Sequence, residues 1–225
     1  LADAGSPLTP GLIGALAMAG VQNVSVLRQP RIVVLITGDE VVAPGAAARH
    51  GQIPDANGPL LAAHLQHWQC PPLRIEYVAD TEAAVRDAID RGFKDADLVV
   101  TTGGVSVGDK DYILPMAEAL GVQRVFWKVA QKPGKPLYFG VRGRQLLLGL
   151  PGNPAAVLIG LALHVRAALD VLEGAQHIGA SWLPARLSQG IKADSQRDSL
   201  LRMRLDYSSD GLARLHPMPH QDSHM

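Results

Sequence analysis

Cysteine is nearly absent from this chain, because Cys70 is the single thiol among 225 residues. One cysteine cannot form an internal disulfide, which excludes a small disulfide-stapled scaffold and favours a reducing compartment. Aromatic residues are also few, at 4% of the chain. We interpret Trp68, Trp127 and Trp182 as core or rim residues rather than as a stacking platform. These scarcities favour a cytoplasmic protein.

An excess of charge of either sign is lacking, since Lys+Arg and Asp+Glu both number 21. A broad surface for nucleic acid is therefore not expected. No apolar run looks long enough to span a bilayer, and the segment Leu12–Val21 is too short and is interrupted by Gly14 and Gly20. No signal peptide is visible. We expect neither a nucleic acid nor a membrane as a partner.

Hydrophobic residues, by contrast, make up 47% of the chain, enough for a sizeable core in one full domain and part of another. The expected strands are Arg31–Thr37, Arg74–Ala79, Leu98–Thr102, Arg124–Ala130, Leu137–Val141 and Gln145–Leu150. The expected helices are Pro59–Trp68, Thr81–Phe93, Tyr112–Leu120 and Asn153–Leu172. This alternation predicts a three-layer α/β fold with a mostly parallel sheet.

Composition changes twice along the chain. The three predicted parts are the end of a preceding domain or linker at 1–30, the α/β domain at 31–176 and a small β unit at 177–225. In the first part we expect a helix with Thr9 as its N-cap and Gly20 beyond its end, followed by a short strand at Val24–Leu27. The β-like pieces of the last part are Leu183–Leu187, Leu200–Tyr207 and Leu212–His216. So short a unit is expected to lean on the α/β domain or to be truncated.

The segment Thr101–Tyr112, TTGGVSVGDKDY, follows a buried strand. Gly103 and Gly104 let the backbone approach a ligand closely and permit positive φ. Two further glycine–proline turns follow at 132–136 and 149–154. Each alone is readily explained as a tight turn. Because ligands bind at the carboxyl ends of strands in such sheets, the three turns together predict a site for a polyanion.

Acidic side chains gather at the predicted strand ends: Asp39, Glu40, Asp80, Asp109 and Asp111. Such acids suit magnesium, which uses one or two carboxylates together with substrate phosphates. Other interpretations stay open, because Asp80 could cap the helix that begins near Thr81, and Asp55 and Asn57 could cap the one near Pro59. No Cys/His spacing matches a zinc site.

Cationic and helix-terminal groups offer further contacts for an anion. Asn153 and Pro154 open the strongest predicted helix directly after a glycine turn, which makes either an anion site or an ordinary cap. Lys128, Lys132 and Lys135 cluster around Pro133-Gly134. A lysine in an apolar strand, as expected for Lys128, needs a partner or a ligand. The alternative is three solvated lysines.

Five segments, read in order, resemble the molybdopterin molybdenumtransferases, the MoeA-type family that includes the E domain of gephyrin. They are ITGDE (36–40), DAN (55–57), DLVVTTGGVSVGDKDY (97–112), FWKVAQKPGKP (126–136) and GLPGNP (149–154). The resemblance covers most of the chain and implies a molybdopterin-binding α/β domain followed by a β-barrel-like domain, partial here at 177–225. The tail HQDSHM (220–225) is similar to the start of a motif in that domain.

The resemblance implies a transferase that inserts molybdate into adenylylated molybdopterin, uses Mg²⁺ and releases AMP. Its implied catalytic residues are Glu40, Asp80, Asp111, Lys128 and Lys132, and the three acids also form the implied metal site. The implied substrate-binding residues are Thr37, Gly38, Asp55, Asn57, Gly103, Gly104, Ser106, Lys135, Pro151, Gly152, Asn153, Pro154, Arg202 and Ser223. The implied partners are molybdopterin itself, a molybdopterin adenylyltransferase, molybdoenzymes and, in the full-length parent, a second copy.

The sequence departs from the family pattern in several places. The chain begins with Leu1, so we expect a fragment that lacks the N-terminal portion, and it stops soon after Ser223. Ala56 and Asp222 stand where other small residues are expected. Two alternatives stay open: the related molybdopterin adenylyltransferase, and a non-catalytic module that binds a pterin or serves as a scaffold. The fragment by itself is a candidate for binding without turnover.

Overall fold

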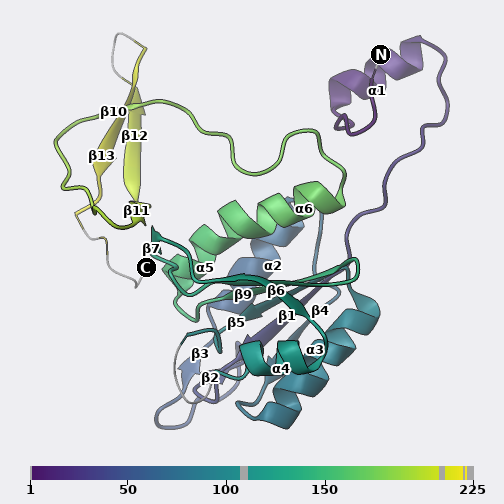
Figure 1. Ribbon diagram of the computed structural model, residues 1–225. Helices are drawn as coiled ribbons and strands as arrows, with labels where there is room; N and C mark the ends of the chain where they lie inside the picture. The colour runs from purple at the N-terminus through teal and green to yellow at the C-terminus, as the bar shows by residue number, and fades with distance from the viewer. Residues whose placement is uncertain (1, 107–110, 208–210, 220, 222–225) are drawn as a thin grey trace.

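A six-stranded sheet forms the centre of the molecule in the computed structural model, which describes residues 2–106, 111–207, 211–219 and 221 (Figure 1). In spatial order the strands are β4 (Arg74–Val78), β1 (Ile32–Thr37), β5 (Leu98–Thr102), β9 (Gln145–Leu150), β8 (Tyr138–Arg142) and β6 (Gln123–Trp127). β4, β1, β5 and β9 pair in parallel, and β8 is antiparallel to both neighbours. The predicted α/β fold with a mostly parallel sheet is confirmed.

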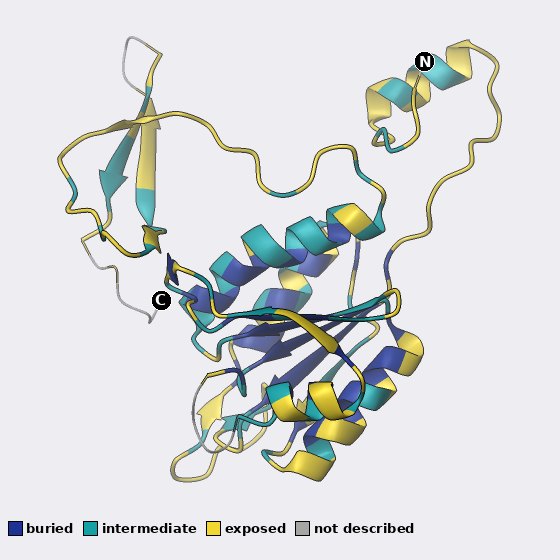
Figure 2. Ribbon diagram, in the orientation of Figure 1, coloured by how far each residue is buried: buried dark blue, intermediate teal, exposed yellow. Residues whose placement is uncertain are grey.

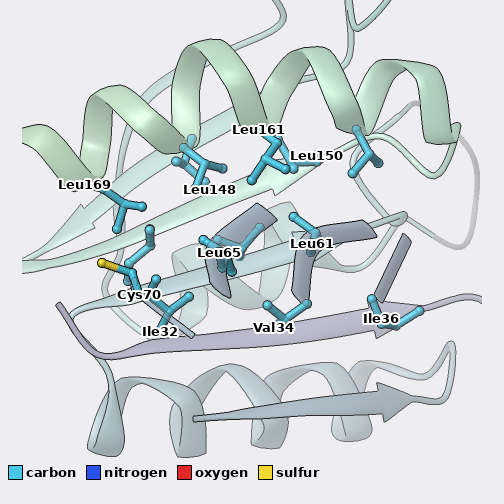
Figure 3. Close-up of a cluster of buried hydrophobic side chains, with 14 of the residues drawn as sticks. Ile32, Val34, Ile36, Leu61, Leu65, Cys70, Leu148, Leu150, Leu161 and Leu169 are labelled. Atoms are coloured by element: carbon cyan, nitrogen blue, oxygen red, sulfur yellow. The ribbon is translucent and has the colours of Figure 1, made fainter. Parts of the chain in front are cut away.

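Helices cover both faces of the sheet (Figure 1). On one face lie α2 (Asn57–His67) and the continuous helix of α5 (Pro154–Gly160), η1 (Leu161–Val165) and α6 (Arg166–Leu172). On the other lie α3 (Glu82–Asp95) and α4 (Ile113–Ala119). All residues of β1 are buried because successive side chains point to opposite faces, so that Val34 packs in one layer and Val33 in the other. Figure 2 shows the central strands and the inward helix faces buried, whereas the edge strand β6 is largely exposed. Figure 3 shows the α2 and α5 side.

The helix 154–172 has the 19-residue length and apolar composition of a membrane span, which the sequence interpretation had denied to every segment. That expectation is therefore wrong by length and composition. One side of this helix is nevertheless packed on the sheet, where Leu161, Val165 and Leu169 are fully buried. This is the packing of a core helix.

Ahead of the sheet, α1 (Pro10–Met18) lies away from the α/β body (Figure 1). The predicted N-cap is confirmed, because Thr9 Oγ1 accepts a hydrogen bond from the Leu12 N–H at 3.2 Å. The predicted strand at Val24–Leu27 is wrong, since that segment carries no strand pairing and its hydrophobic side chains are exposed. Apolar β-branched residues favour an extended chain, but a strand also needs a neighbour.

The last part of the chain contains a three-stranded sheet of β10 (Arg186–Leu187), β13 (Ala213–Pro217) and β12 (Met203–Tyr207). β10 and β12 are shorter than the predicted pieces, whereas β13 has the predicted length and is shifted by one residue. A separate pair, β11 (Asp198–Ser199) and β7 (Gln131–Lys132), joins this part to the α/β domain. The sequence interpretation missed that pair, because a two-residue strand leaves no periodic pattern. It also extended β6 to Ala130, whereas the strand ends at Trp127.

Candidate functional site

A pocket of about 240 Å³ opens at the carboxyl ends of β1 and β5. Its lining residues are Ile36, Thr37, Gly38, Glu40, Val41, Ile53, Asn57, Asp80, Thr102, Gly103, Gly104, Asp111 and Gly152. Two short paired strands, β2 (Val41–Val42) and β3 (Ile53–Pro54), contribute part of the wall. Strand ends, a helix start and the loops that follow β1, β4, β5 and β9 therefore meet in one cavity, as expected at the carboxyl edge of a parallel sheet.

Glycine is required at the two positions that follow β5. Gly103 and Gly104 have φ of +84° and +64°, and a Cβ on Gly103 would lie 2.8 Å from the carbonyl oxygen of Thr37. The Thr37 hydroxyl donates to the carbonyl of Thr102 at 3.1 Å, and the Gly103 N–H donates to the carbonyl of Leu150 at 3.0 Å. Packing of β1 against the end of β5 thus accounts for Gly103, and the side chains of Thr37 and Ile113 crowd Gly104.

Three predicted acids, Glu40, Asp80 and Asp111, line this pocket together. Asp80 is held by a reciprocal pair of hydrogen bonds: its Oδ2 accepts from the Asp39 N–H at 3.2 Å, and its N–H donates to Asp39 Oδ1 at 3.0 Å. The alternative that Asp80 caps α3 is wrong, because Thr81 Oγ1 accepts from the Ala84 N–H. Asp109 lies outside the described residues. Among those described, no three His, Cys, Asp or Glu residues form a ready-made metal cluster.

The start of α2 supplies an amide to the same pocket. Asp55 caps the helix by accepting from the N–H groups of Asn57 and Gly58 at 2.8 and 3.0 Å, which confirms its structural interpretation. Burial and the Asp55 contact raise the pKa of Tyr77, whose hydroxyl donates to Asp55, to about 12. Asn57 Nδ2 donates to the carbonyl of Gly152 at 2.8 Å, while its buried Oδ1 has no hydrogen-bond partner in the structure. This acceptor is available to a ligand.

The lysine loop, residues 128–136, follows β6 at the same edge of the sheet. Lys128, Lys132 and Lys135 are exposed, and none of the three is among the residues that line the pocket. Lys128 has a φ of +72°, and its Nζ lies 3.9 Å from the Trp127 ring centroid. The Trp127 indole in turn donates to the carbonyl of Val105 at 2.9 Å, next to the glycine pair. The partner expected for Lys128 is therefore an aromatic face.

The remaining predicted residues stand around the pocket. Asn153 caps α5, since its Oδ1 accepts from the N–H groups of Ala155 and Ala156 at 3.0 and 3.3 Å, and Pro154 occupies the first turn. Ser106, Pro151, Asn153, Pro154 and Asp55 do not line the cavity. The backbone N–H of Arg202 donates to Gln221 Oε1 at 3.0 Å, within the C-terminal part. Ser223 lies outside the described residues.

Residues 33–171 match the family model described as "Probable molybdopterin binding domain". The chain belongs to the molybdopterin binding domain family. It is 38% identical over 172 residues to a molybdopterin molybdenumtransferase of Haemophilus influenzae, covering 76% of this chain and 42% of that protein. It is 33% identical over 223 residues to one of Nostoc sp., covering 96% and 50%. The resemblance drawn from the motifs is confirmed, and the chain spans about half the length of these curated relatives.

Solved structures agree with this membership. The molybdopterin biosynthesis moeA protein of Pyrococcus horikosii superposes with a TM-score of 0.75 and 26% identity, covering 96% of this chain and 52% of that one. A molybdenum cofactor biosynthesis protein of Pyrococcus furiosus superposes at 0.66 with 23% identity, covering 96% and 65%. The second likeness supports the fold alone. Both extend over the α/β domain and most of its flanking segments.

Four lining residues of this molybdopterin-binding domain escaped the sequence interpretation: Ile36, Val41, Ile53 and Thr102. Ile36 and Thr102 could have been found, because each is the residue next to a predicted site position at a strand end. Val41 follows the predicted site residue Glu40 but lies outside every predicted strand, and Ile53 adjoins no predicted site residue. They come together through the pairing of β2 with β3, whose two residues each are too short to be recognised.

Proposed function

We propose that this chain is the molybdopterin-binding part of a molybdopterin molybdenumtransferase, which inserts molybdate into adenylylated molybdopterin and releases AMP. The observation that carries the proposal is the shared pocket of Glu40, Asp80 and Asp111 beside the glycine turn that follows β5. The partnerless buried Oδ1 of Asn57 in its wall also supports a polar ligand. The names of the curated relatives favour the same chemistry.

Magnesium fits the donor set of this pocket. Its ligands are hard oxygens, and it commonly binds to one or two carboxylates with substrate phosphates completing the shell. Glu40, Asp80 and Asp111 provide carboxylates from three different loops around one cavity, which suits a shared protein–substrate site. When bound, the ion supplies positive charge to a phosphate group. The Asp39–Asp80 hydrogen bonds orient Asp80 for this role.

The lysine loop supplies the complementary charge in this proposal. Lys128 and Lys132 offset negative charge on phosphate and molybdate, an electrostatic role that grows as water is excluded. β6 lies three strands from β5 in the sheet, which corresponds to about 14 Å at the usual strand spacing. A compact anion in the pocket does not bridge that span. An elongated substrate, with a pterin and a nucleotide joined by phosphates, has the required reach.

The two alternatives predict different roles for residues 177–225. A molybdopterin adenylyltransferase is expected to lack a β unit tied to the lysine loop, whereas a pterin-binding scaffold has no need of the three pocket acids Glu40, Asp80 and Asp111. Here β11 pairs with β7, and the Leu200 N–H donates to the carbonyl of Lys132 at 2.8 Å. That connection supports the insertase over the adenylyltransferase, and the three acids support it over the scaffold. A cytoplasmic location, a homodimer and exchange with an adenylyltransferase or with molybdoenzymes stay predictions, as does the Mg²⁺ requirement.

A reconstitution assay tests the proposal. Adenylylated molybdopterin, molybdate and Mg²⁺ are incubated with this chain and, in parallel, with a longer protein of the relatives' length. AMP and the molybdenum cofactor are then quantified. We expect molybdate-dependent AMP release from the longer protein and substrate binding by this chain. AMP release that ignores molybdate, or an adenylylation of free molybdopterin from ATP, contradicts the proposal and favours the alternatives.

A further inference from the structure

His164 makes a hydrogen bond to the lysine loop from the long core helix. Its Nε2 lies 3.0 Å from Oε1 of Gln131, a residue only 8% exposed. Gln131 Nε2 donates to the carbonyl of Pro133 at 3.1 Å. Because a carbonyl can only accept, that contact fixes which way the Gln131 amide faces, and Oε1 must accept from His164. The His164 proton therefore resides on Nε2. Burial lowers the pKa of His164, which favours the neutral ring.

The helix is locally modified where His164 lies. Val157, Leu161, Val165 and Leu169 are spaced by four residues and all are fully buried. In a regular α-helix, residues four apart drift by about 40° around the axis at each step. The π-helical turn η1, with more residues per turn, reverses part of that drift between Leu161 and Val165. It keeps the apolar side on the sheet while His164 reaches the lysine loop.

The lysine loop closes around the Gln131 side chain. A Cβ on Gly134, which has a φ of +97°, would lie 2.6 Å from Gln131 Nε2. On its outer side the loop is held by backbone pairing, since the Asp198 N–H donates to the carbonyl of Ala130 at 2.8 Å. The inner anchor is the side chain of Gln131, and its polar contacts are His164 and Pro133. Losing His164 leaves a buried acceptor unsatisfied.

We propose that His164 is a positioning residue, which through Gln131 holds the lysine loop against the core helix at the carboxyl edge of the sheet. This placement of the loop does not depend on which reaction the protein catalyses. Its consequence for reaction rests on the proposed function, in which Lys128 and Lys132 act on an anionic substrate. His164 itself touches no reacting group in this account.

Hydrogen–deuterium exchange of this chain tests, without any substrate, whether His164 holds the lysine loop through Gln131. In His164→Ala we expect the amides of residues 129–136 to exchange faster by about tenfold or more, with a folded core. His164→Gln keeps an N–H donor of similar reach and restores protection, whereas the shorter His164→Asn does not. His64→Ala is the matched control, since His64 is a half-buried histidine packed on Trp68 in α2. Equal loop exchange in His164→Ala and His64→Ala overturns the proposal.

Kinetics separate this proposal from the proposed function. In the reconstitution assay with the longer protein, His164→Ala should lower kcat/KM for AMP release roughly five- to 100-fold, mainly through KM, and His164→Gln should recover it. If the unmodified protein releases no AMP, the proposed function fails. Hydrogen–deuterium exchange of the lysine loop then decides by itself whether His164 positions that loop. If His164→Ala does not fold, Gln131→Met removes the same hydrogen bond from the other side. The proposal is also overturned if the lysine-loop amides of both His164→Ala and Gln131→Met stay as protected from exchange as in the unmodified chain.

Discussion

Gly104 and Asp111 illustrate how single residues at the pocket are constrained. A Cβ on Gly104 would lie 2.9 Å from Cγ1 of Ile113, so packing alone demands glycine there. Packing does not demand an acid at Asp111, which lines the cavity beside Glu40 and Asp80. Structural necessity thus explains the glycine turn, and the acids are better candidates for chemistry. Substitution of the glycine should therefore lower stability, whereas substitution of the acid should lower activity.

Gly104→Val should lower the free energy of unfolding because the new side chain meets Ile113 and the backbone is left-handed. The control is Gly143→Val, since Gly143 has a similar φ of +62° and nothing within 4 Å of an added Cβ. We expect the control to lose about 1 kcal/mol from backbone strain, and Gly104→Val to lose roughly 1–3 kcal/mol more from overpacking. Urea denaturation measures both. Equal losses would show that crowding is unimportant.

Asp111→Asn should reduce AMP release in the longer protein by about 100-fold or more, because a charged group is lost from the electrostatic site. The fold should be preserved, since the change keeps the side-chain volume. Asp87→Asn, at an exposed position of α3, is the control. Rates of AMP release and circular dichroism check the expectation. A near-normal yield of molybdenum cofactor from Asp111→Asn would remove Asp111 from the metal site.

Helix beginnings position much of the site at the scale of elements. α2 starts beside Asp55 and sends Asn57 to the pocket, and α5 starts at Asn153 directly after Gly152. The hydrogen bond from Asn57 to Gly152 joins the two beginnings. Their caps are therefore part of the pocket's support. The long helix that continues from α5 carries the π turn and His164.

Asn153→Ala should cost about 1 kcal/mol of global stability through loss of the N-cap. The N–H groups of Ala155 and Ala156 lose their acceptor in the variant. Thr9→Ala is the matched control, because it removes the cap of α1, a helix with no buried residues. Chemical denaturation followed by near-ultraviolet absorption of the core should detect the first change and miss the second. Similar midpoints for Asn153→Ala and the parent chain would contradict the prediction.

The whole molecule is organised by the carboxyl edge of the sheet, where the described residues of segments 37–41, 55–58, 102–106, 111–112 and 150–154 meet. The opposite edge has a different role. There Arg28 donates to both carboxylate oxygens of Asp97 at 2.6 and 2.7 Å, and the Arg31 N–H donates to Oδ2 at 2.8 Å. These contacts join the segment that precedes β1 to the residue directly before β5. The division into parts at 30/31 and 176/177 stays a prediction.

Asp97→Asn should lower stability at neutral pH and have little effect in strong acid. Arg28, with Arg31, holds the pKa of Asp97 at about 2, below its ordinary value near 3.8. A depressed carboxyl pKa stabilises the fold above the unfolded value, and that contribution is lost as pH falls towards the folded value. At pH 7 we expect the free energy of unfolding of the variant to be about 1 kcal/mol below that of the parent chain, given that the arginine is solvent-exposed. This difference should narrow from pH 4 towards pH 2. Denaturant titrations at several pH values measure this difference, and a difference that is constant with pH contradicts the prediction.

The parts of the fold that could be predicted have strong local signals. β5 and β9 have the predicted bounds, and Thr9 and Asn153 cap helices as expected. The errors occur where a distant contact decides. Lys128 leaves the strand to lie over Trp127, and Val24–Leu27 finds no strand to pair with. The acids and glycines of the pocket were predicted from their places at strand ends, whereas the position of the lysine loop was not.

By itself, the order of residues determined the alternation of strands and helices, the carboxyl-edge acids and the family motifs. These are local properties, set by periodicity, capping and turn chemistry within a few residues. Only the tertiary structure decided that Asp80 bonds Asp39, that β7 pairs with β11 and that His164 supports Gln131. Each of those contacts joins segments distant along the chain. Their partners are selected by how the packed layers bring buried polar groups together, and no local pattern encodes that choice.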